Sequence, residues 1–159
     1  MRKIIYSAAL LALGLTSENL VHAEPFQSLA VPNLPKTHCY IRIDDAHISS
    51  KVVKGGHEVV KVNARSTCNY PQEHLTLFVE IWKMGSLGPT LVTWEPASAL
   101  KYPVSTNHPF KNEKTFKACK GSQVTRYFGI AWSDALVNGR WVVAGPVRSL
   151  NAVPLPCGT

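Results

Sequence analysis

Histidine and carboxylate side chains are the residues of this sequence best suited to acid–base chemistry. Asp45 and His47 are two residues apart, so on a strand they share a face and can form the carboxylate–imidazole pair that orients a general base. A basic nuclease would also use His57, Glu58 and Arg65, the arginine stabilising phosphate charge. None of the common hydrolase, metalloprotease, nucleotide-binding or calcium-binding motifs occurs.

A cluster of basic residues suits the binding of anions. Four lysines follow one another at a spacing of three, and an arginine comes shortly after them: Lys111, Lys114, Lys117, Lys120 and Arg126. Clustered positive charge concentrates phosphate, sulfate and similar groups, so we interpret this set as a candidate anion patch. The alternative is a solvated loop, or an edge strand whose charges prevent aggregation. The formal net charge of +7 is compatible with an anionic partner.

The tryptophans offer a second kind of binding surface, because aromatic rings supply large contact areas. Three of them fall within strand patterns, which predicts that they lie in the core: Trp82, Trp132 and Trp141. Trp94 lies near a proline in a long connection. Its exposure beside Tyr102 and Phe110 would indicate a surface for sugar stacking or for a partner.

The first 23 residues predict a secretory signal peptide. Arg2 and Lys3 precede an apolar run over residues 4–15, and Val21–Ala23 forms a small-residue cleavage site. An uncleaved anchor would need about 20 apolar residues, and this run is shorter. We therefore expect a signal peptide over 1–23, an extended proline-containing segment over 24–36 and a single β domain over 37–159, located outside the cell, in the periplasm or in the cell envelope.

Cysteine pairing is expected because an exported chain folds under oxidising conditions. The cysteines are Cys39, Cys68, Cys119 and Cys157. Zinc sites normally draw on closely spaced cysteine pairs, whereas these four are far apart in the sequence. The chain therefore predicts two disulfides, no metal and no cofactor.

An Asn138-Gly139 dipeptide favours one pairing of these cysteines. Asn-Gly tolerates the positive φ angles of a type I′ turn, and it separates the predicted strands Val124–Ser133 and Trp141–Val147. Cys119 and Cys157 lie at nearly equal distances from this turn, so antiparallel arms extended that far bring them together and leave Cys39 for Cys68.

A second hairpin gives weaker support to the same pairing. The Lys54–Gly56 turn lies between the predicted strands Ile48–Val53 and Val59–Ala64. Cys39 and Cys68 fall near facing positions if a bulge or bend shifts the register. Links from Cys39 to Cys119 or Cys157 remain alternatives.

Apolar residues repeat with the period of strands. Alternation over Leu75–Trp82 is the clearest example. Prolines fall between most of the strand patterns, and Gly85–Lys111 is predicted to be a long connection with a short strand at Thr90–Trp94. Short strands separated by turns predict an all-β, antiparallel β-sandwich, immunoglobulin-like in general architecture and cross-linked by two disulfides.

Two classes of function fit these expectations. The first is a small exported, disulfide-stabilised, non-enzymatic binding or interaction module, whose partner is a protein or an anionic surface and whose loops make the contacts. The second is a small, basic, exported hydrolase such as a nuclease. An enzyme requires a histidine, a carboxylate and a cation that converge in a cleft, whereas a binding module requires an exposed patch.

Overall fold

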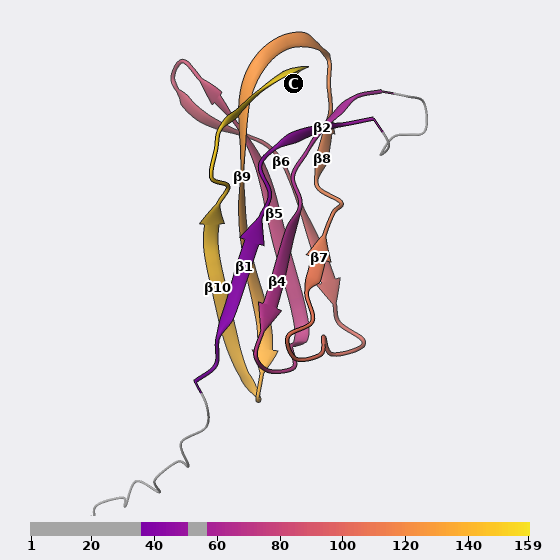
Figure 1. Ribbon diagram of the computed structural model, residues 1–159, viewed down its shortest axis with the longest axis vertical. Coiled ribbons are helices and arrows are strands. Elements are labelled where there is room, and N and C mark those ends of the chain that lie inside the picture. The colour runs from indigo at the N-terminus through magenta and orange to yellow at the C-terminus, as the bar shows by residue number, and fades with distance from the viewer. Residues whose placement is uncertain (1–35, 51–56) are drawn as a thin grey trace, which may run out of the picture. The chain divides into compact units, whose positions relative to one another are not determined.

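The computed structural model describes residues 36–50 and 57–159 (Figure 1). The predicted signal peptide, residues 24–35 of the proline-containing segment and the predicted Lys54–Gly56 turn lie outside the described residues. Residues Pro35–Thr159 form one compact unit. Within the described ranges, no helix has the length and apolar character needed to cross a bilayer.

The larger layer of the fold is an antiparallel sheet in the order β10-β9-β5-β6. Its strands are β5 (Glu73–Gly85), β6 (Gly88–Ala99), β9 (Gly121–Val137), β10 (Arg140–Arg148) and β11 (Val153–Gly158). β5 pairs with one edge of β9, while β10 and β11 pair with successive halves of the opposite edge. β9 is therefore central, as its apolar residues on both faces predict.

Three chain segments form the second layer. Each contributes two short strands, namely β1 (Cys39–Ile43) with β2 (His47–Ser49), β3 (Val59–Lys61) with β4 (Ala64–Cys68), and β7 (Phe110–Asn112) with β8 (Phe116–Ala118). They pair as β1-β4-β7 and as β2-β3-β8, antiparallel throughout. Figure 1 shows β1, β4 and β7 side by side, with β2 and β8 beyond them. The pairing of β2 with β3 makes these segments antiparallel, as the second predicted hairpin requires.

The core lies between the two layers. Leu75, Leu77, Val79 and Ile81 of β5 are fully buried, which confirms the strand predicted from their alternation. Three of them share one apolar cluster with a set of side chains from the other layer: Ile41, Val60, Val62 and Ala64. The predicted all-β antiparallel β-sandwich is confirmed.

Buried Asn112 connects the two layers by hydrogen bonds. Its Nδ2 atom donates to the carbonyl oxygens of Leu77 at 3.0 Å and Glu95 at 2.8 Å. Its Oδ1 atom accepts from the backbone N–H of Lys114 at 3.1 Å. A buried amide satisfied in this way contributes to stability and fixes how β7 lies against β5 and β6.

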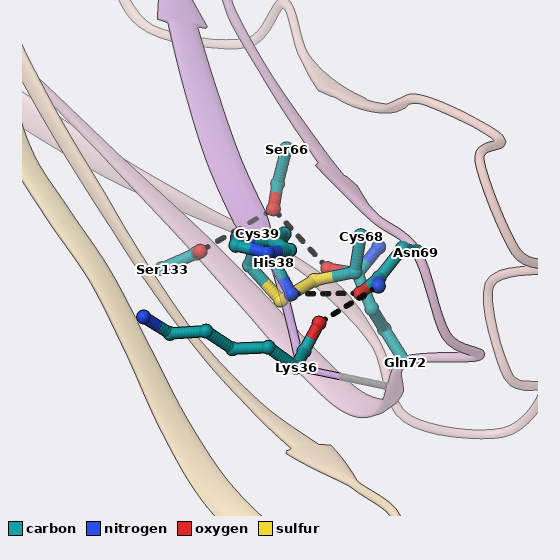
Figure 2. The surroundings of a disulfide bond; sticks show 8 residues. All are labelled: Lys36, His38, Cys39, Ser66, Cys68, Asn69, Gln72 and Ser133. Carbon is teal, nitrogen blue, oxygen red and sulfur yellow. Dashed lines mark hydrogen bonds between the residues drawn. A yellow bond between two sulfur atoms is a disulfide. The ribbon is translucent and has the colours of Figure 1, made fainter. Parts of the chain in front are cut away.

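Both predicted disulfides are present. Asn138 and Gly139 have φ angles of 51° and 72°, and Trp141 lies opposite Leu136 across this turn. Beyond a break after β10, β11 continues along β9, and Cys119 bonds to Cys157. The second bridge joins Cys39 to Cys68, which are directly opposed on β1 and β4 (Figure 2).

The prediction of a long connection is wrong between Gly88 and Ala99, although the short strand expected at Thr90–Trp94 is present as part of a longer one. Instead of a long connection with a short strand, the chain forms the 12-residue β6 immediately after a tight turn. Pro89 and Pro96 lie within this strand. Proline lacks a backbone donor and is tolerated on edge strands, and β6 is an edge strand whose pairing partner is β5.

Candidate functional site

The outer face of the five-stranded sheet carries a layer of aromatic side chains. Successive side chains on a strand point to opposite faces, so the inward direction of Leu77 and Val79 on β5 turns Phe78 and Trp82 outward. Register and ring contacts place the neighbouring outward residues beside them. We call the following set the aromatic face: Phe78, Trp82, Trp94, Phe128, Trp132, Trp141 and Arg148.

One group of rings on the aromatic face crosses three strands. Phe78 on β5 lies opposite Trp132 on β9. Their ring centroids are 5.2 Å apart, with planes inclined by 10°. On the other side, the ring of Phe78 lies 6.4 Å from that of Trp94 on β6. Stacked aromatic pairs contribute about 0.5–1.5 kcal/mol beyond the area they bury, so the group is held in place by its own contacts.

A second group stacks an arginine on the rings. Trp82 and Phe128 have centroids 6.3 Å apart and planes inclined by 14°. The guanidinium carbon of Arg148 lies 4.1 Å from the centroid of Phe128, within the range of a cation–π interaction. The indole N–H of Trp82 donates to the Glu80 carboxylate at 2.6 Å. These contacts fix the orientation of each ring before any partner binds.

Large apolar side chains on the same face remain open to solvent. Trp94 is 51% exposed, Trp141 64% and Val143 70%. Apolar residues scattered singly over a surface need no explanation, whereas a contiguous set marks an interaction site. Trp94 contacts the stacked rings, and Trp141 and Val143 lie on the same sheet face along β10, so the aromatic face is the best candidate for a binding surface.

The structure corrects the predicted positions of three tryptophans. Trp82 and Trp132 are half-buried on the outer face rather than in the core, and Trp141 is exposed there. A strand with apolar residues on both sides does not reveal which side meets the other layer. Trp94 is exposed, and its ring partner is Phe78.

The residues of the candidate anion patch occupy several elements. Lys111 is on β7 and Lys117 on β8, while Lys114 and Lys120 follow these strands. Arg126 lies on β9, opposite Pro154 of β11 in the other layer. Their joint action on an anion stays a prediction.

Register reveals a cationic arrangement that the sequence analysis missed. Arg42 on β1 lies directly opposite Arg65 on β4, and Arg65 lies opposite Lys111 on β7. All three are exposed, and we call them the cation row. Directly opposed like charges destabilise a sheet by roughly 0.2–1 kcal/mol per pair. The three residues are far apart in the sequence, so finding this row would have required a prediction of which residues face one another across the strands.

A polar pocket of about 170 Å³ borders the cation row. It is lined by Asp44, Asn63, Ala64, Arg65, Lys111 and Glu113. The Lys111 ammonium lies 3.9 Å from the Glu113 carboxylate, an exposed ion pair of little energetic value. The Asn63 amide donates to Asp44 at 3.5 Å, and its Oδ1 atom accepts no hydrogen bond from the part of the chain that the structure describes.

The residues considered for a hydrolase do not meet in one pocket. His57 and Glu58 line a pocket of about 300 Å³ beside Cys119, whereas Arg65 lines the pocket at the cation row. Across residues 36–50 and 57–159, no group of three or more histidine, cysteine, aspartate or glutamate side chains is arranged to hold a metal ion.

The carboxylate–imidazole pair considered for Asp45 and His47 does not form. The Asp45 carboxylate instead accepts two hydrogen bonds from Asn151, from the side chain at 2.7 Å and from the backbone at 3.0 Å. These bonds, the side-chain one foremost, hold the pKa of Asp45 below its ordinary value of 3.8. The Nδ1 atom of His47 lies 3.3 Å from the backbone oxygen of Asp45, so the carboxylate does not orient this ring.

Comparison with known proteins provides no family assignment. No model of a known protein family matches the chain, and no curated protein has a recognisably similar sequence.

Proposed function

We propose that the protein is an exported, non-enzymatic binding module that recognises a protein partner through the aromatic face. The observation that carries the proposal is the exposure of Trp94 and Trp141 on a sheet face already organised by stacked rings. Tryptophan and arginine are the residues most enriched among those that dominate the energy of protein interfaces. Export is supported by the two disulfides, which persist in oxidising compartments, and by the predicted signal peptide.

The ring geometry favours a protein over a sugar as the partner. Sugar recognition by stacking requires open ring faces, but Phe78 stacks on Trp132 and the Arg148 guanidinium lies over the ring of Phe128. The ring edges and the apolar side chains around them can pack against side chains on the surface of a partner protein. Since the rings are already ordered, little conformational entropy is lost when the partner binds.

The test is capture of a partner by the immobilised protein, followed by measurement of its affinity. The bait is exposed to proteins from the envelope and medium of the cells that produce it, and the captured protein is then purified. Trp94→Ala and Trp141→Ala are each expected to weaken binding about tenfold or more, since truncating a dominant interface residue costs roughly 2 kcal/mol. Tyr102→Ala is the matched control, because Tyr102 is 71% exposed and lies after β6.

Three results would contradict the proposal. The first is unchanged affinity in the Trp94→Ala/Trp141→Ala double variant at an unchanged melting temperature. The second is binding of a neutral polysaccharide that these same variants abolish. The third is hydrolysis of RNA by the purified protein that a His57→Ala variant abolishes, which would favour the hydrolase.

A further inference from the structure

The cation row presents three positive charges at regular intervals on the outer face of the smaller layer. Arg42, Arg65 and Lys111 occupy directly opposed positions on β1, β4 and β7. Neighbouring strands are about 4.8 Å apart, so the side chains leave the sheet at that interval along a line across the strands. A linear polymer that carries one anionic group on each unit can place successive groups opposite the three cations.

The two arginines of the row have no carboxylate partner in the described ranges. The guanidinium of Arg42 lies over the ring of Tyr40, 5.7 Å from its centroid, and the one ion pair found in those ranges joins Lys111 to Glu113. An arginine fork binds a carboxylate, sulfate or phosphate through two parallel hydrogen bonds. The guanidinium groups of Arg42 and Arg65 are thus available to an external anion.

The adjoining pocket adds the groups that a sugar ring requires. Its volume of about 170 Å³ is similar to that of the roughly 150 Å³ cavity that admits a benzene ring. Arg65 and Lys111 supply positive charge, while Asp44, Glu113 and Asn63 supply acceptors for hydroxyl groups. The two cations in its lining disfavour a metal ion and favour a ligand that carries both an anionic group and hydroxyls.

We propose that the cation row and this pocket bind an acidic polysaccharide built from uronate sugars. Carboxylates of successive sugars contact Arg42, Arg65 and Lys111, and one ring enters the pocket. This site lies on the layer opposite the aromatic face, so the inference goes beyond the proposed function. It differs from the predicted anion patch by including Arg42 and Arg65, and it shares Lys111 with it.

Other polyanions fit the surface less well. Proteins that bind single-stranded nucleic acid stack bases on aromatic rings, whereas the ring of Tyr40 is already occupied by Arg42. Attachment to anionic membranes generally uses clusters of about 4–8 basic residues, and Asp44 and Glu113 partly offset the charge of this row. Asp44 and Glu113 can accept hydrogen bonds from the hydroxyl groups of a sugar.

The test measures binding of polygalacturonate fragments by calorimetry, using disulfide-bonded protein purified from the cells that produce it. Binding is expected to weaken as salt is added. Arg65→Gln and Lys111→Gln each lower the affinity about tenfold, the loss expected when a charge-assisted hydrogen bond is removed. Lys117→Gln, which removes one positive charge as each of these substitutions does, is the control and leaves the affinity unchanged. The Trp94→Ala variant also retains binding.

Folding is checked by the melting temperature, which the charge variants should not lower, because their side chains are exposed and opposed like charges destabilise the sheet. The inference is overturned if polygalacturonate does not bind, or if the control variant weakens binding as much as Arg65→Gln does. It is equally overturned if heparin, DNA, vesicles of anionic lipid or neutral mannan bind more tightly than polygalacturonate.

Discussion

Replacing Cys119 and Cys157 with serine is expected to lower the free energy of unfolding by about 2–5 kcal/mol. This bridge connects the chain just before β9 to β11, which pairs with β9 near the end of the chain. Without it, β11 is free to separate, and the buried hydroxyl of Tyr127 loses the Cys157 carbonyl to which it donates. Since small domains are stable by roughly 5–15 kcal/mol in total, this loss removes a large share of the stability and lowers the amount of folded protein that accumulates.

Urea unfolding of the double-serine variant and of the unaltered protein measures this effect. The Cys39→Ser/Cys68→Ser variant is expected to lose a similar amount, because the two bridges close loops of comparable length, with sequence separations of 29 and 38. Ser86→Ala in the exposed β5–β6 turn is the control and should stay within about 0.5 kcal/mol of the unaltered protein. A double-serine variant that melts at the unaltered temperature would refute the role assigned to this bridge.

Replacing Gly129 with alanine is expected to cost about 1–3 kcal/mol, the usual penalty for overfilling a packed core. Gly129 lies on β9 at a close approach of the two layers. A Cβ atom there would lie 2.6 Å from Val62 Cγ1 and 2.8 Å from Ile43 Cδ1. Val62 is fully buried and its branched side chain is stiff, so the layers must move apart.

Gly121→Ala provides the matched control for this substitution. Gly121 lies on the same strand, and a Cβ atom there meets no atom within 4 Å. Its replacement should be neutral or stabilising by up to about 1 kcal/mol, because alanine restricts the unfolded chain. Equal urea midpoints for the two variants would show that the layers are not packed at Gly129 as described.

The sequence was informative where local patterns determine structure. The alternation from Leu75 to Ile81 predicts β5 because each inward position is apolar. The Asn138-Gly139 turn fixes the register of the hairpin that it closes, and that register predicted the link between Cys119 and Cys157. A turn and an alternating pattern are properties of neighbouring residues, which the sequence records directly.

Features that depend on partners distant in the sequence were missed. Pro96 discouraged a long strand at β6, because only the position of β6 at the sheet edge makes proline acceptable there. The outward direction of Trp132 depends on which side of β9 meets the other layer. The cation row requires the registers of three strands from separate segments, and Arg42 drew no attention by itself.

Oxidative footprinting tests the central claim, that the aromatic face is the binding surface, most directly. The protein is treated with hydroxyl radicals alone and in complex with its captured partner, and the reactivity of each aromatic side chain is determined by mass spectrometry. Trp94 and Trp141 are exposed in the free protein, so we expect both to be strongly protected in the complex while Tyr102 stays reactive. Unchanged reactivity of Trp94 and Trp141 in a saturated complex would contradict the account.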